Sequence, residues 1–96
     1  MKNPPRPDEW DVVQTDTKVW GSGLLTISGN SRQRHAIEPD DAVSIEVETD
    51  DMSFYAPDLR VNPDGAVRIP THQRNLYGVR DGDWVTLRAK KEDITY

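Results

Sequence analysis

The stretch Gly65-Ala66-Val67-Arg68-Ile69-Pro70 has a counterpart 42 residues earlier, Gly23-Leu24-Leu25-Thr26-Ile27-Ser28. The same offset continues without a gap and matches Arg32 with Arg74, Ile37 with Val79, Asp41 with Asp83, Val43 with Val85, and Ile45 with Leu87. Identical or apolar residues therefore recur along one register. This pattern predicts an internal duplication, with repeats at about 11–56 and 57–96 that together form one domain, 11–96.

Each repeat is expected to begin with a β-hairpin. Asn62-Pro63-Asp64-Gly65 is a strong turn signal, because proline presets φ, Asn and Asp stabilise turns, and glycine accepts a positive φ. Gly21-Ser22-Gly23 occupies the same place in the first repeat. The alternation of side chains predicts these facing pairs across the hairpins: Val61 and Val67, Arg60 and Arg68, Leu59 and Ile69, then Val19 and Leu25, Lys18 and Thr26, Thr17 and Ile27.

A connector and an alternating strand are expected to follow each hairpin. Residues 71–77 favour a short helix ended by Gly78, with Leu76 and Val79 as its core contacts. Residues 29–35 are weak helix formers, which leaves open a turn of helix or a loop. The strand pattern predicts Val43, Ile45, Val47, Val85, Leu87 and Ala89 inside and Trp84, Thr86 and Arg88 outside. A short strand at 52–55 should close the first repeat.

Composition excludes several classes of protein. The 96 residues contain no cysteine, so disulfides and thiolate metal sites are excluded. No apolar run reaches the roughly 20 residues of a membrane span, and the start lacks an apolar signal region, so we expect a cytoplasmic protein without a membrane partner. Residues 1–10 are Pro-rich and predict a flexible arm, with Trp10 packing it onto the domain.

The charge is distributed unevenly between the repeats. The net charge is −5, with many more Asp than Glu, which is typical of a salt-adapted, halophilic protein. Residues 17–58 hold three basic and eight acidic residues, whereas residues 59–96 hold seven basic and five acidic residues. The second repeat is therefore the part of the chain expected to attract a polyanion.

The second repeat resembles the AbrB/MazE/SpoVT swapped-hairpin family. The resemblance rests on Gly65-Ala66-Val67-Arg68-Ile69-Pro70, Arg74, Gly78-Val79 and Gly82-Asp83-Trp84-Val85. The first repeat looks like a degenerate copy, with Ser28, Ala36 and Asp40 where the motif has proline and two glycines. The resemblance implies a mostly β fold with short helical connectors. Two β-hairpin–helix–β-hairpin units would exchange hairpins and form a swapped-hairpin barrel, here as a single-chain pseudo-dimer of archaeal origin.

The family resemblance also implies a DNA-binding transcription regulator. Its duplex contacts come from basic residues on the hairpin faces and connectors. Transferred to this chain, those positions are Arg60, Arg68, Arg74, Lys18, Arg32 and Arg34. For each arginine taken alone, a solvated strand residue beside acidic neighbours is the alternative interpretation.

The alternative function is a protein-interaction module or an antitoxin-like regulatory partner of the same fold, without DNA binding. Acidic residues 38–51, the arm, and the faces of Trp20 and Trp84 would then contact a protein partner or a second copy in a homodimer. We expect neither an enzyme nor a cofactor, because the chain has no nucleophile elbow and no phosphate loop. We also expect no metal, since His35 and His72 lack a ligand cluster and the acid pairs lack EF-hand spacing.

Overall fold

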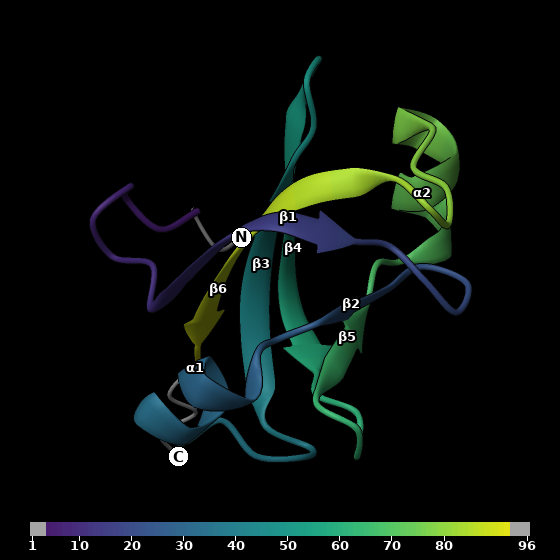
Figure 1. Cartoon of the computed structure of the whole chain (residues 1–96). Helices are drawn as coiled ribbons and strands as arrows, with labels where there is room; N and C mark the ends of the chain where they lie inside the picture. The colour runs from purple at the N-terminus through teal and green to yellow at the C-terminus, as the bar shows by residue number, and fades with distance from the viewer. Residues whose placement is uncertain (1–3, 93–96) are drawn as a thin grey trace.

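A computed structural model of the chain describes residues 4–92 (Figure 1). The first three residues of the expected arm and the last four of the second repeat lie outside this range. The elements are β1 (Val12–Lys18), β2 (Leu24–Thr26), α1 (Gly29–Arg34), β3 (Ala42–Glu48), β4 (Ser53–Arg60), β5 (Ala66–Arg68), α2 (Thr71–Tyr77) and β6 (Trp84–Lys91). The expected mostly β architecture with two short helical connectors is confirmed.

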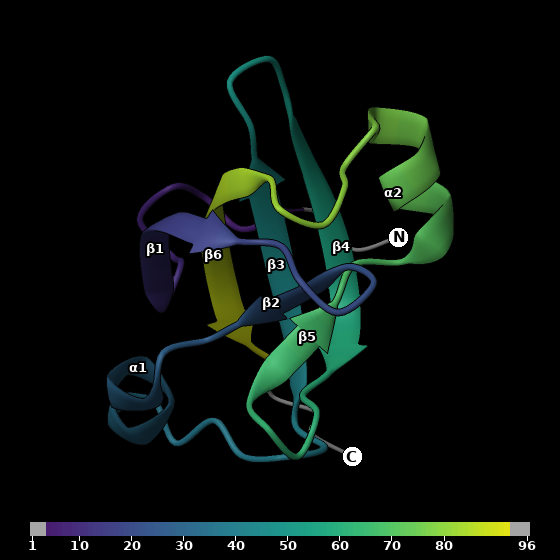
Figure 2. The same ribbon diagram turned by 45° about the vertical axis from the view of Figure 1, so that its right-hand side comes forward.

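The strands form two antiparallel layers. Four strands make a sheet in the order β1-β6-β3-β4, and β2 and β5 pair as a separate ribbon that crosses one face of this sheet (Figures 1 and 2). Among the described residues the two sheets are not joined into a closed barrel. In this respect the structure departs from the barrel that the family resemblance implied.

The duplication is visible in the strand pairing. Val12 of β1 pairs with Ala89 of β6. The residues at the equivalent positions of the other repeat, Phe54 of β4 and Val47 of β3, also pair with each other. Positive φ angles recur at the same offset, for example at Asp16 and Asp58. The first repeat is therefore β1-β2-α1-β3 and the second β4-β5-α2-β6. The segment expected to close the first repeat lies instead at the start of β4, which is the counterpart of β1.

The two hairpin turns form as expected, but the hairpins extend no further. Asn62 N–H donates to Ala66 O at 2.8 Å, and Trp20 pairs with Leu24 in the first repeat. Beyond these turns the predicted facing pairs are wrong. In the ladders Arg60 pairs with Ala42, Arg68 with Leu24 and Lys18 with Trp84. The strands separate because β1 and β4 each form a longer ladder with the last strand of the other repeat.

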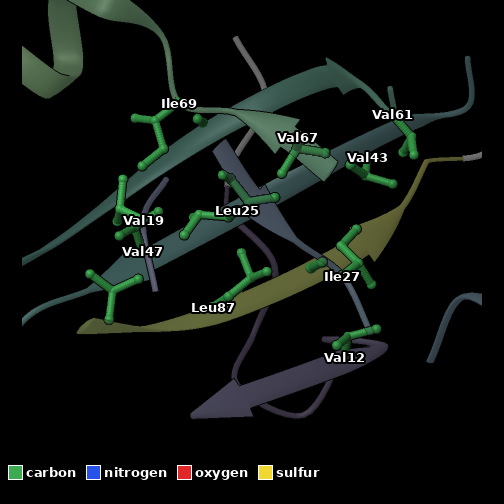
Figure 3. Close-up of a cluster of buried hydrophobic side chains, with 14 of the residues drawn as sticks. Val12, Val19, Leu25, Ile27, Val43, Val47, Val61, Val67, Ile69 and Leu87 are labelled. Carbon is green, nitrogen blue, oxygen red and sulfur yellow. The ribbon is translucent and has the colours of Figure 1, made fainter. Parts of the chain in front are cut away.

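The core lies between the ribbon and the sheet. Leu25 and Val67 pair at the centre of the ribbon and are fully buried, in one cluster with Val43, Val47 and Leu87 of the sheet (Figure 3). The predicted inward strand residues are all buried, and their alternation with Trp84, Thr86 and Arg88 is confirmed. The ribbon cannot bury its apolar face alone, so both repeats are required to build one core.

The two connectors are both helical. Helix α2 ends at Gly78 with φ 69°, as predicted, and Val79 is buried. The prediction for Leu76 is wrong, since it is 72% exposed. The neighbouring Tyr77 takes its place and stacks on Phe54 with ring centroids 4.6 Å apart. Helix α1 is six residues long, and its first turn is capped by the Ser28 hydroxyl, which accepts from Ser31 N–H.

The described part of the N-terminal arm forms a turn, in which Glu9 N–H donates to Arg6 O at 2.9 Å. Trp10 contacts Tyr55 edge-to-face at 6.4 Å between ring centroids, so this tryptophan holds the arm against the outer face of the sheet, as expected. Within residues 4–92, neither helix has the length and apolar character needed to span a membrane.

Candidate nucleic-acid interface

The connector arginines hold equivalent positions at opposite ends of the ribbon. Arg32 Nε donates to Ile27 O at 2.9 Å, and Arg74 Nε donates to Ile69 O at 3.2 Å. Each side chain then extends over the turn glycine of the other repeat. A Cβ at Gly65 would overlap the Arg32 guanidinium, and a Cβ at Gly23 would overlap Arg74. The glycines therefore provide the space in which the two guanidinium groups lie.

Arg68 joins Arg74 at one end of the ribbon. Its Nη1 donates to the carbonyl oxygens of Gly21 at 3.2 Å and Ser22 at 2.8 Å. We call Gly21–Gly23 the glycine loop. Because Arg74 lies against Gly23 in the same loop, the fold brings together two of the predicted site residues that are distant from the first hairpin in the sequence.

A carboxylate completes this end of the ribbon. Asp81 accepts hydrogen bonds from Ser22 N–H at 2.9 Å and Gly23 N–H at 3.0 Å. These two bonds, and secondarily the positive charges of Arg74 and Arg68, hold the pKa of Asp81 below its usual value. The glycine loop thus holds a guanidinium on its carbonyl groups and an anion on its N–H groups.

The other end of the ribbon is closed differently. Gly65 N–H donates to Asn62 O at 2.9 Å and Ala66 N–H donates to Asp64 Oδ1 at 3.3 Å, so this turn satisfies its own N–H groups. Arg32 is the cation that packs on it. Arg34 lies on the same helix, is exposed, and makes no ion pair within the part of the chain that the structure describes.

The remaining two predicted residues lie at strand ends. Lys18 Nζ is 5.8 Å from the ring centroid of Trp84, in a cation–π arrangement. Arg60 Nη1 donates to Asp40 O at 2.8 Å. The predicted Arg60–Arg68 pair is therefore not formed. The ribbon gathers Arg68 and Arg74 at one end and places Arg32 at the other.

Sequence reasoning missed Asp81 and the glycine–arginine contacts. Asp81 and Gly82 lie in the turn before β6, where Gly82 has a φ of 95°. Asp81 is 58 and 59 residues from the backbone groups it binds. A pairing of this kind leaves no local signal, because it depends on how the two repeats dock.

A different surface surrounds Trp84. This side chain is 63% exposed and Trp20 is 42% exposed, so their predicted outward placement is confirmed. Trp20 Nε1 donates to Thr26 Oγ1 at 2.9 Å. Trp84 lines a shallow hollow of about 360 Å³ with the following residues: Thr49, Asp50, Asp51, Gly82 and Asp83. We call this the Trp84 hollow. Its rim is acidic, in contrast to the basic end of the ribbon.

Across residues 4–92, no group of three or more His, Asp or Glu side chains is placed to hold a metal ion. No family model matches the chain, and no curated protein matches it either. The fold is similar to the solution structure of PHS018 from Pyrococcus horikoshii, with a TM-score of 0.66 and 24% identity over 83% of this chain and 92% of that chain. This similarity shows a shared fold.

Proposed function

We propose that the protein binds duplex DNA through the outer face of the β2–β5 ribbon, with Arg68 and Arg74 at one end and Arg32 at the other. The observation that supports this most directly is the fixed placement of Arg32 and Arg74. Both guanidinium groups are anchored through Nε and lie at opposite ends of one ribbon. Fixed guanidinium groups lose little entropy when they bind phosphate oxygens.

The arrangement suits a two-fold symmetric ligand. The two arginines are related by the 42-residue repeat, as are the helices α1 and α2 that carry them and the strands β2 and β5 of the ribbon. The backbone of duplex DNA has a local two-fold axis, and regulators commonly match it with their own symmetry. The AbrB/MazE/SpoVT motif in the second repeat adds to this argument. On this proposal the two repeats act as the halves of a pseudo-dimer in a cytoplasmic transcription regulator.

A salt titration tests this function. We expect Arg68→Gln with Arg74→Gln to weaken duplex binding about tenfold or more and to reduce the slope of log K against log salt by about two. The matched control is Arg6→Gln with Lys90→Gln, which removes two charges from the arm and the outer sheet face. Fluorescence anisotropy with a labelled duplex gives both quantities. Equal slopes for the two double variants would contradict the proposed interface.

A second candidate is protein interaction, favoured by the Trp84 hollow. The residue equivalent to Trp84 in the first repeat is Ala42, which is buried, so the fold does not require an exposed tryptophan at this position. Lys18 already lies on the indole, and Asp50 and Asp51 line the hollow. These features suit a cationic segment of a partner protein.

Binding of a short Arg- and Lys-containing peptide tests the second candidate. We expect calorimetric binding that Trp84→Ala abolishes and Trp20→Ala leaves unchanged. The same peptide with Gln at its basic positions is the ligand control. Equal binding by the Trp84→Ala variant would remove the hollow as the site.

A further inference from the structure

The glycine loop has an unusual run of backbone angles. Gly21, Ser22 and Gly23 have φ of 54°, 68° and 93°, so three successive residues adopt positive φ. Such runs can turn neighbouring N–H groups toward one point and create a concave site for an anion. In the second repeat the corresponding residues are Pro63, Asp64 and Gly65, of which only Gly65 has positive φ. The second repeat therefore forms the equivalent turn with one positive φ angle, and the fold does not require the two additional ones at Gly21 and Ser22.

The loop already holds an anion. The two oxygens of the Asp81 carboxylate take the N–H groups of Ser22 and Gly23 separately, at 2.9 and 3.0 Å. Two oxygens of a phosphate group can make the same two bonds. Asp81 is exposed on the turn between α2 and β6, beside Gly82, so its side chain can leave without unpacking the core.

Two guanidinium groups lie on the glycine loop beside this position. Arg68 is held on the carbonyl side of the loop, and Arg74 lies against Gly23. Both are close enough to Asp81 for their charges to favour its ionised form. One carboxylate against two guanidinium groups leaves an excess of positive charge, which favours the approach of a further anion.

We infer that the glycine loop is a phosphate-binding site whose resident occupant is the Asp81 carboxylate, and that an incoming phosphate group displaces Asp81. The Ser22 and Gly23 N–H groups and the Arg68 and Arg74 guanidinium groups are its ligands. The inference deepens the proposed function, because on DNA the incoming group is a backbone phosphate. The site itself does not depend on DNA, since free inorganic phosphate also presents two unesterified oxygens to the two N–H groups.

Amide chemical shifts test the site directly. Inorganic phosphate is titrated into the wild-type chain, into Asp81→Asn, and into Asp83→Asn as the control, because Asp83 binds Arg80 N–H in the adjoining turn. We expect the Ser22 and Gly23 amides to shift in a saturable manner, with a Kd about tenfold lower for Asp81→Asn than for wild type. Asp83→Asn should show only the smaller gain that any lost acidic charge produces.

Further variants keep this test decisive. Arg68→Gln in the Asp81→Asn background should lose the gain in phosphate affinity. Asp81→Ser serves if the asparagine disturbs the loop, with unchanged Leu25 and Ile69 amide shifts as the sign of an intact ribbon. Equal phosphate affinity in the Asp81 and Asp83 variants, or shifts that do not involve Ser22 and Gly23, would overturn the inference.

A duplex titration of the same three chains separates this site from the proposed function. Asp81→Asn should raise duplex affinity about tenfold, and Asp83→Asn should give the smaller rise that any lost acidic charge produces. If phosphate binds the loop but no chain binds duplex, the proposed function fails and the phosphate site stands. If duplex binds and both variants respond equally, the site fails and the function stands.

Discussion

The first repeat (Val12–Glu48) and the second (Ser53–Lys91) share a backbone plan but differ at its exposed positions. The second repeat has Trp84 where the first has Ala42, and Asp81 where the first has Pro39. The first has Trp20 and the Gly21-Ser22 pair where the second has Asn62 and Pro63-Asp64. Both sequences satisfy the same fold, so these differences are not required by it.

The unmatched residues gather around the first hairpin turn. Asp81 and Arg68 of the second repeat bind the glycine loop of the first, and Trp84 lies beside Lys18. The second hairpin turn instead closes on its own Asn62 and Asp64. The two repeats thus form two equivalent ends of the ribbon, and one of these ends carries a set of polar groups from both repeats.

The largest effect is expected where the repeats are most alike, at the ribbon centre. Leu25→Ala removes a fully buried side chain and should lower the free energy of unfolding by about 2–5 kcal/mol. Val67→Ala should cost less because it removes one carbon atom fewer than Leu25→Ala. Urea denaturation of both variants and the double variant measures their coupling. If the losses in the free energy of unfolding of the two single variants add up to that of the double variant, the two repeats do not share one core at this point.

A smaller effect is expected at the glycines that carry the arginines. Gly23→Ala and Gly65→Ala each place a side chain at positive φ and displace Arg74 or Arg32, and should cost about 1–3 kcal/mol. Gly82→Ala is the control, because it also has positive φ but its Cβ would meet no atom within 4 Å. Thermal unfolding ranks the three variants. A cost for Gly82→Ala equal to the other two would show that the arginine contacts contribute nothing.

The smallest effect is expected from titration of Asp81, which the first repeat lacks at this position. Its pKa is lowered in the folded chain from 3.8, so its stabilisation is present above about pH 3.8 and is lost as pH falls through the lower folded value. Asp81→Asn should therefore be less stable than wild type at pH 7, with the difference shrinking below pH 3.8. Urea midpoints at several pH values measure it. A constant difference down to pH 2 would contradict this linkage.

Much of the fold could be predicted from the sequence because its signals are local. The repeat, the two turns, α2 with Gly78, and the alternation of Val85, Leu87 and Ala89 follow from short-range pattern and backbone preference. Leu76 was misplaced because a two-turn helix does not reveal by its pattern which side faces the core.

The pairing of strands and the candidate site were decided by tertiary structure. The sequence by itself determined the duplication, the β-rich class and the types of residue available at the ribbon. Only the docking of the repeats decided that Arg68 lies beside Leu24 rather than Arg60, and that Asp81 reaches Ser22 and Gly23. The physical reason is that each strand has several partners with a compatible alternation, and the choice among them depends on the core that both repeats bury together.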